Sequence, residues 1–341
     1  MVSATDLALP KGALVLVTGA NGFIASHVSD QLLQMGYRVR GTVRSEKPWL
    51  EEHFRQVYGP ERYHNVIVTA MEEPGAFQEA MKDISGVVHV ASDMSYDPRP
   101  DIAIPRAVAG TMNVLESAEQ EGTVERVVLT SSSTAALRAV QDDAGVVVDE
   151  NSWNHASIEA AWSPDTPETE KPGIVYCASK TKQESTAWEW YKDSKRGFVL
   201  NAVLPNVNIG PTIAPEIPGS TTALIRSVLV GNTMPINLVK PQYFIDVRDT
   251  ARLHVAALLD RNVTSQRIFA FAHAANWNDI IPILRRLRPN NDQIPDAPEN
   301  EGRDLSSIRP REKAMQLLER FFGQADWTTL EESLKSSIDG F

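Results

Sequence analysis

The sequence is poor in cysteine, which limits where the protein can work. Its 341 residues include one cysteine, Cys177, so no disulfide can form within the chain. A chain without disulfides suits a reducing compartment. No apolar run approaches the length of a membrane span, and the first residues lack the charged and apolar regions of a secretory signal. We therefore expect a cytoplasmic protein that does not bind a membrane.

Basic residues are also in the minority. Lysine and arginine total 33 against 44 aspartate and glutamate residues, which gives a net charge of −11. This balance argues against nucleic acid or an anionic membrane as a partner, although a local group of arginines can still hold a phosphorylated cofactor. The seven histidines show no zinc-binding spacing such as His-Glu-x-x-His, so we expect no metal site.

The segment 14–25 combines an apolar run with two glycines. The run 14–17 is typical of a strand buried on both faces, and a one-turn apolar repeat follows from Gly22. A glycine turn between a strand and a helix collects free N–H groups at the positive end of the helix, which favours a pyrophosphate. The alternative is an ordinary strand–helix turn. The expected cofactor contacts here are Gly19, Asn21, Gly22, Phe23 and Ile24.

The second predicted strand indicates which dinucleotide is bound. An NAD site usually carries an acid about 20 residues past the glycines, where it accepts hydrogen bonds from the ribose. No acid occurs between Asp30 and Glu46, and Arg40 and Arg44 stand there instead. Because guanidinium groups suit a 2′-phosphate, we predict NADP(H). The alternative is a pair of solvated arginines at a strand end.

Strand and helix patterns alternate through the first 204 residues. This alternation predicts an α/β fold, a Rossmann-type doubly wound parallel sheet whose ligands lie at the carboxyl ends of the strands. The expected strands are 14–18, 37–44, 66–68, 86–91, 127–129 and 198–204, and the expected helices are 22–36, 45–58, 75–82, 101–119 and 173–195. The small residue Ala91, at the end of the fourth strand, would let the cofactor lie close.

The predicted organisation has two parts. Residues 1–204 form the NADP-binding domain, with a loose arm over 1–11 and a surface excursion over about 140–172. Residues 205–341 form mainly a smaller, irregular substrate-binding lobe, with some segments returning to the Rossmann core. In this second part we expect helices at 223–230, 247–259, 277–287 and 312–322 and a strand at 268–271.

Two further motifs could carry chemistry. Tyr176 and Lys180 lie one turn apart on one face of a predicted helix, where a cation would lower the pKa of the phenol and make it a usable acid–base group. The segment 130–133, Thr-Ser-Ser-Ser, ends the fifth strand, where a hydroxyl could donate to a carbonyl oxygen. Each has an ordinary explanation, a surface pair on a helix or a turn with local backbone bonds. Their occurrence after the glycine turn favours catalysis.

In combination these motifs resemble the extended short-chain dehydrogenases/reductases. Within them the chain is most similar to the fungal and yeast NADPH-dependent aldehyde/carbonyl reductases, relatives of plant dihydroflavonol reductase. The resemblance covers nearly the whole chain. It is carried by the segments 18–25, 39–44, 129–132, 201–206 and 241–243 together with Tyr176-x-x-x-Lys180.

The resemblance implies roles for the catalytic residues. Tyr176 would protonate the carbonyl oxygen, and Lys180 would hold the nicotinamide ribose and depress the pKa of Tyr176. Ser132 would polarise the carbonyl, with Ser131 and Ser133 as neighbouring alternatives.

The resemblance also assigns supporting positions. Pro205 and Asn206 would flank the nicotinamide and the substrate, and Asn113 would support the active-site geometry. One position departs from the family pattern, because Ala70 stands where an aspartate commonly bonds the adenine amine. Backbone groups or Glu72 would then hold the adenine.

Several residues are candidates for the substrate pocket, although aromatic and methionine side chains more often belong to a core. These candidates are Met94, Tyr96, Ser133, Val207, Gln242 and Tyr243.

The function predicted is NADPH-dependent reduction of an aldehyde or ketone to an alcohol. The expected substrate is small, neutral and largely apolar, and the protein is expected to be a monomer or homodimer. Two alternatives remain open. One is a nucleotide-sugar epimerase or dehydratase of the same superfamily, and the other is a non-catalytic regulator that senses NADP.

Overall fold

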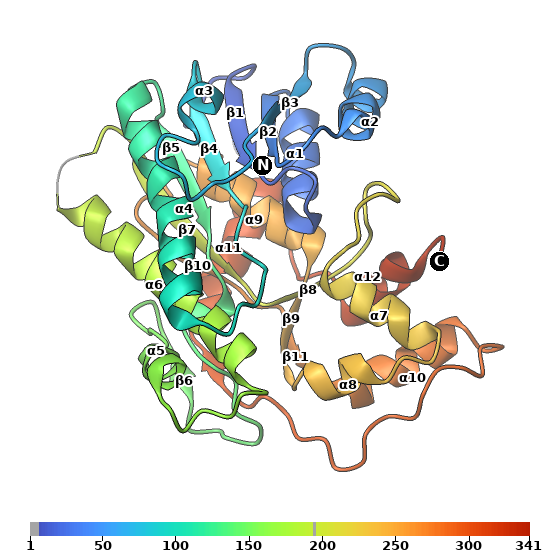
Figure 1. Ribbon diagram of the computed structural model, residues 1–341. Helices are drawn as coiled ribbons and strands as arrows, with labels where there is room; N and C mark the ends of the chain where they lie inside the picture. Colours follow the sequence, from blue (N-terminus) through green and yellow to red (C-terminus); the bar gives the residue numbers. More distant parts are fainter. Residues whose placement is uncertain (1–6, 194–195) are drawn as a thin grey trace.

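A sheet of seven parallel strands forms the centre of the molecule (Figure 1). The computed structural model describes residues 7–193 and 196–341. The strand order is β10-β7-β5-β4-β1-β2-β3, so the chain builds the sheet outward from β1 in both directions and confirms the predicted doubly wound fold. The strands are β1 (Leu14–Thr18), β2 (Arg38–Val43), β3 (Tyr63–Ile67), β4 (Gly86–His89), β5 (Arg126–Thr130), β7 (Val199–Pro205) and β10 (Arg267–Ala270).

Helices cover both faces of this sheet because its strands are apolar on both sides. In β1, Val15 and Val17 pack with α1 and α9, whereas Leu14 and Leu16 pack with α3 and α4. The first face carries α1 (Phe23–Gln34), α2 (Pro48–Tyr58), α9 (Val247–Leu259) and α11 (Arg311–Phe322), and the second carries α3 (Gln78–Met81), α4 (Pro100–Glu121) and α6 (Lys171–Lys192). Among the described residues no helix is both long and apolar enough to cross a membrane.

Residues 7–9 of the N-terminal arm are packed against α9. Leu7 and Leu9 are buried, and the N–H of Ala8 donates to the carbonyl of Leu259 at 2.7 Å. The prediction of a loose arm is therefore wrong for residues 7–9, because two leucines find apolar cover beside α9. Residues 1–6 lie outside the described part of the chain. The predicted helix end near Lys195 also lies outside the described residues. In the described part, α6 ends at Lys192.

A smaller body follows β7 and lies beside the sheet (Figure 1). It contains a three-stranded sheet in the order β11-β9-β8. Its elements are β8 (Val207–Ile209), α7 (Thr221–Leu229), α8 (Met234–Leu238), β9 (Gln242–Asp246), β11 (His273–Ala275), α10 (Trp277–Leu287) and α12 (Leu330–Ile338). The sequence did not predict this sheet, because its strands carry no long apolar run and pair with distant segments, as Val207 does with Phe244.

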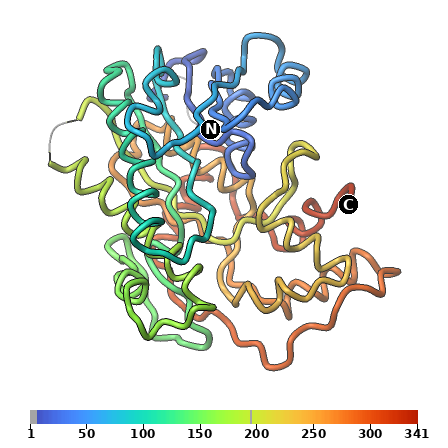
Figure 2. The backbone as a smooth tube through the Cα atoms, viewed as in Figure 1, coloured from blue at the N-terminus to red at the C-terminus, as the bar shows by residue number. Residues whose placement is uncertain are grey.

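The segment after β5 is tied to the C-terminal part of the chain. It contains the short helix η2 (Ser133–Ala135), the strand β6 (Val147–Val148) and the helix α5 (His155–Trp162). The strand β6 pairs in parallel with β12 (Ser307–Ile308). Figure 2 shows the long orange segment that leads from the smaller body to this pair. The two parts of the chain are thus joined at more than the single crossing after β7.

One buried arginine fastens α9 to the central sheet. Arg126, at the start of β5, is 4% exposed. Its guanidinium donates to the carbonyls of Leu258 at 3.0 Å, Ala257 at 2.9 Å, Asp260 at 3.0 Å and Val263 at 2.6 Å. These bonds satisfy carbonyls at the C-terminal end of α9 that have no partner within the helix, together with one carbonyl of the turn that follows. The helix α9 therefore belongs to the Rossmann core, although it follows residue 205.

Candidate active site

The glycine turn after β1 is closed by the neighbouring strands. Gly19 has φ +66°, and a Cβ there would lie 3.2 Å from Cα of Ala91. Only glycine fits this backbone and this approach without strain. The hydroxyl of Thr18 accepts from the N–H groups of Val90 and Ala91, both at 3.0 Å. The end of β4 is therefore drawn against the turn, as the predicted contact at Ala91 requires.

The N-terminus of α1 is open to a ligand. Gly22 is the N-cap and carries no capping side chain, so the first N–H groups of the helix have no side-chain partner there. Such a helix end stabilises negative charge. Phe23 is buried, whereas Asn21 and Ile24 are half-buried. The predicted phosphate contacts are thus gathered at one helix end.

The structure separates the two arginines predicted to bind a 2′-phosphate. Arg40 lies in the middle of β2 and donates to the carbonyls of Ala80 at 3.0 Å and Lys82 at 2.7 Å. Its guanidinium therefore caps the end of α3. Arg44 follows the carboxyl end of β2, is exposed, and forms no ion pair with any residue that the structure describes. Of the two, Arg44 is the one placed at the ligand edge of the sheet.

Ser132 is held by Thr134 so that its own hydroxyl hydrogen can be directed at Tyr176. Its Oγ accepts from the N–H of Thr134 at 3.2 Å and from the hydroxyl of Thr134 at 2.9 Å. Burial raises the pKa of Tyr176, and a hydrogen bond from Ser132 acts in the opposite direction. The hydroxyl of Ser132 and the phenol of Tyr176 therefore face each other, as a carbonyl-binding pair requires.

The other two serines of the cluster are placed differently. The hydroxyl of Ser131 donates to Oε2 of Glu184 at 2.6 Å. Ser133 is buried in the first turn of η2. Only Ser132 is brought to the phenol, which favours it among the three.

Lys180 follows Tyr176 by one turn on α6 and is buried. Its ammonium donates to the carbonyl of Thr130 at 3.1 Å. Burial lowers the pKa of Lys180 to about 8, and the carboxylate of Glu184 opposes this shift. In contrast to the expected lowering, the pKa of Tyr176 is raised, because burial of the phenol, together with Tyr96 and Cys177, outweighs the hydrogen bond from Ser132.

His89 completes the polar layer under the site. Its Nδ1 lies 2.8 Å from the Thr18 hydroxyl, and its Nε2 lies 3.4 Å from the Thr111 hydroxyl. Burial lowers the pKa of His89 to about 3, so the ring is neutral and structural. Asn113, two residues after Thr111 on α4, donates to the carbonyls of Met71 and Glu73, both at 2.9 Å. It fixes the loop after β3, next to Ala70.

Of the predicted substrate residues, the structure brings Tyr96 to the catalytic phenol. The rings of Tyr96 and Tyr176 have centroids 5.1 Å apart. Met94 lies on the same loop and is exposed. Tyr243, by contrast, donates to the carbonyl of Ser306 at 3.0 Å and is part of the lobe packing.

The remaining predicted residues follow the end of β7. Asn206 donates its N–H to the carbonyl of Ala270 at 3.2 Å, which holds the segment after Pro205 against β10. The Asn206 side chain accepts from the N–H of Val207 at 2.8 Å. Gln242 lies at the start of β9, where its side chain donates to a backbone carbonyl two residues earlier at 3.1 Å.

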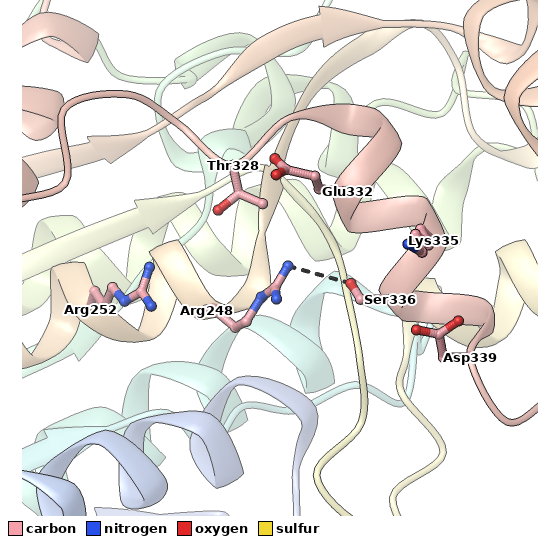
Figure 3. A pocket seen from close by; sticks show the side chains of 7 residues that line it. All are labelled: Arg248, Arg252, Thr328, Glu332, Lys335, Ser336 and Asp339. Atoms are coloured by element: carbon pink, nitrogen blue, oxygen red, sulfur yellow. Dashed lines mark hydrogen bonds between the residues drawn. The ribbon is translucent and has the colours of Figure 1, made fainter.

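A separate pocket of about 340 Å³ contains none of the predicted site residues (Figure 3). It lies between the start of α9 and α12, where Arg248 donates to Ser336 at 3.4 Å. The buried Asp246 and Asp249 pair with Arg248 and Arg252, so the arginines of the lining carry no uncompensated charge. No cluster of metal-ligating side chains occurs in the part of the chain that the structure describes.

Comparison with known proteins gives a consistent result. The model described as NAD dependent epimerase/dehydratase family matches residues 15–271. The chain is similar to the ketoreductase nvfG of Aspergillus novofumigatus, with 39% identity over 332 residues and 97% of each chain covered. It is also similar to aldehyde reductase 2 of Sporidiobolus salmonicolor, with 37% identity over 342 residues, covering 99% of this chain and 98% of that protein.

Solved structures agree with these relatives. Yeast methylglyoxal/isovaleraldehyde reductase Gre2, complexed with NADPH, superposes with a TM-score of 0.79 at 26% identity and covers 96% of this chain and 97% of that chain. Gre2 of Candida albicans in complex with NADPH superposes with a TM-score of 0.80 at 27% identity, with 96% and 98% covered.

Proposed function

The chain belongs to the NAD dependent epimerase/dehydratase family, and we propose that it is an NADPH-dependent reductase of aldehydes and ketones. The observation that carries this proposal is the hydrogen bond between Ser132 and Tyr176, with Lys180 one turn further along α6 and bonded to Thr130 at the carboxyl end of β5. Relatives named as ketoreductase and aldehyde reductase support the same reaction class.

The residues present fit a phosphorylated dinucleotide. The close approach of Gly19 to Ala91 and the uncapped end of α1 form a cradle for the pyrophosphate. Arg44 is the residue for the 2′-phosphate, with the fork of donors that such a group prefers. Lys180 holds the nicotinamide ribose, and Pro205 and Asn206 flank the ring. Bound NADPH supplies the hydride.

Two hydroxyl groups of this chain act on the carbonyl oxygen. Ser132 donates its hydroxyl hydrogen to the oxygen and stabilises the negative charge that develops there. Tyr176 gives its phenolic proton to the same oxygen, which yields the alcohol. Lys180 keeps positive charge under the phenol, so that loss of the proton costs less free energy.

The substrate is proposed to be a neutral, largely apolar carbonyl compound. Tyr96 lies against Tyr176 and Met94 is on the same loop, and both present exposed apolar surface to a substrate. Val207 and the smaller body beyond it supply the opposite side. The body formed mainly by residues 205–341 is therefore assigned to substrate binding.

The first experiment measures oxidation of NADPH and of NADH with a panel of aryl ketones, ketoesters and aldehydes. Turnover with NADPH, and much less with NADH, is expected. Tight NADP binding without any turnover would favour a regulator that senses NADP, and copurified NAD would favour a nucleotide-sugar epimerase or dehydratase. Either result would contradict the proposal.

A further inference from the structure

A buried ion pair lies directly behind the proposed catalytic residues. Glu184 on α6 is 1% exposed, and Arg267 on β10 is 7% exposed. Nε of Arg267 donates to Oε1 of Glu184 at 2.7 Å, and Nη2 donates to Oε2 at 3.2 Å. A bidentate, desolvated pair of this kind fixes the relative position of the two elements that carry it.

The same carboxylate collects further donors. The hydroxyl of Ser131 donates to Oε2 at 2.6 Å, and the indole N–H of Trp188 donates to Oε1 at 3.1 Å. Glu184 therefore joins three elements, namely α6, the end of β5 and the edge strand β10. The residue after Ser131 is Ser132, so this bond sets the position of the backbone from which the carbonyl-binding hydroxyl projects.

Arg267 extends this connection to the segment after β5. Its Nη1 donates to the carbonyls of Glu150 at 2.9 Å and Ser152 at 2.7 Å. Its guanidinium also lies 3.9 Å from the ring centre of Trp153. All three guanidinium nitrogens therefore have acceptors in the protein, which explains how the two charges can stay largely desolvated.

Glu184 is also one helical turn from Lys180, on the same face of α6. The groups around the Lys180 ammonium are the carbonyl of Thr130 on β5, His89 on β4 and Glu184, with Tyr176 one turn earlier on α6. His89 is neutral, so Glu184 supplies the negative charge in this set. The charge is shared with Arg267 but acts on Lys180 at short range.

We infer that Glu184 is a positioning residue of the active site, which fixes Ser131 beside Ser132 and provides the counter-charge that keeps Lys180 an ammonium ion. This inference rests on the proposed function for its kinetic consequences only. The Ser131 bond and the effect on Lys180 belong to the protein without cofactor. They can therefore be measured even if the reaction were a different one.

The test compares Glu184→Gln, Glu184→Asp and the double variant Glu184→Gln/Arg267→Met with the wild type. Protonation of Lys180 is followed by NMR of ¹³C-labelled lysine side chains, with Lys180→Met to assign the signal. In the wild type the expected pKa of Lys180 is about 8. In Glu184→Gln and in the double variant this pKa should fall by about 1 unit, and in Glu184→Asp it should stay close to the wild-type value.

Kinetics supply the second readout. With saturating NADPH, the alkaline fall of kcat should move to lower pH by a similar amount in the two variants without the carboxylate, and not in Glu184→Asp. Ser131→Ala removes only the contact between Ser131 and Glu184. It should lower kcat without moving the pH at which kcat falls. The double variant removes both buried charges together, so it keeps the comparison valid if Glu184→Gln alone folds poorly.

Asp249→Asn is the matched control. Asp249 is also a buried carboxylate, held by Gln324 and Thr328 in the smaller body and far along the chain from α6. This variant should lose stability without any change in the Lys180 pKa or in the pH dependence of kcat. An unchanged Lys180 pKa in a folded double variant would overturn the inference, and so would an equal change in Asp249→Asn.

Discussion

The ring of Tyr96 lies against the ring of Tyr176, with centroids 5.1 Å apart and ring planes inclined at 31°. Tyr96 reaches this position through a backbone φ of +53°, which is unfavourable for a residue with a side chain. Strain of this kind costs roughly 1–3 kcal/mol and concentrates at functional sites. The ring remains 47% exposed, so it offers a flat apolar wall next to the phenol.

Replacement of Tyr96 by alanine should therefore weaken the binding of aromatic substrates. We expect KM for an aryl ketone to rise by about 2–10-fold, the value of one aromatic pair, while KM for NADPH stays unchanged. Steady-state kinetics with an aryl and a small alkyl ketone provide the measurement. Tyr96→Phe should behave like the wild type. An equal rise of KM for both ketones in Tyr96→Ala would argue against a contact between the Tyr96 ring and an aromatic substrate.

Tyr176→Phe should lower kcat by about 10²–10⁴-fold, because the variant lacks the proton that the carbonyl oxygen receives. NADPH binding, measured by fluorescence, should be retained. The matched control is Tyr191→Phe, which removes a hydroxyl from the far end of the same helix, where it donates to the carbonyl of Phe198 at 3.1 Å. Near-full turnover by Tyr176→Phe with cofactor bound would exclude the proposed mechanism.

Ser132→Ala should lower kcat by about 10²–10³-fold through loss of one donor to the developing oxyanion. Ser133→Ala, at the first position of η2, should have a much smaller effect on kcat. The comparison decides among the serines of the cluster. If Ser133→Ala proved the more damaging change, the carbonyl-binding hydroxyl would have to be reassigned.

Arg44→Ala should raise the Kd for NADPH by about 10–100-fold, the equivalent of a lost charge-assisted hydrogen bond, and leave the Kd for NADH almost unchanged. Arg40→Ala serves as the control, since its guanidinium is engaged by the carbonyls of Ala80 and Lys82. It should lower the thermal midpoint without changing the ratio of the two constants. A change of cofactor preference in Arg40→Ala would restore its predicted role.

Stability should decline as the pH falls from 6.5 toward 3. Burial lowers the pKa of His89 to about 3 and that of His254 to about 4, both from 6.5. In this window the two histidines are protonated in the unfolded chain but neutral in the folded chain. Each histidine therefore lowers the free energy of unfolding by about 1.4 kcal/mol for each unit by which the pH falls. Urea unfolding between pH 7 and pH 4.5 measures the slope.

The variant His254→Gln should reduce this slope, whatever its effect on stability at pH 7. His155→Gln, at an exposed position, should leave the slope unchanged. A wild-type slope of zero across this window would show that neither ring is held neutral by burial.

The elements that sequence patterns predicted well are those with long apolar runs. The strand at 14–18, the helix at 247–259 and the helix at 277–287 all have the predicted bounds. Each combines a sustained period with a clear stop. The small sheet of the lobe was not predicted, because its register depends on contacts between residues as distant as Val207 and Phe244.

In the candidate site, too, some residues could be predicted from the sequence and others could not. Glycines, Tyr176 and Lys180 could be found because their spacing alone implies a geometry. Glu184 could not, because a glutamate in a helix is usually solvated and only the fold places it against Arg267. Arg40 was assigned to the cofactor for a related reason, since a sequence does not show which carbonyls a mid-strand arginine will meet. The cytoplasmic location and the oligomeric state stay predictions.

The four carbonyls held by Arg126 set a limit on how this protein could be recombined with its relatives. A fragment ending at residue 204 would lose all four of these carbonyls together with β10 and α9, so it should not be an independent folding module. A chimera with a new substrate specificity would have to exchange 206–246, 273–306 and 329–341 while retaining 247–272 and 307–328. The boundary between the two bodies therefore cannot be placed at a single position in the sequence, because segments that follow residue 205 pack with the central sheet.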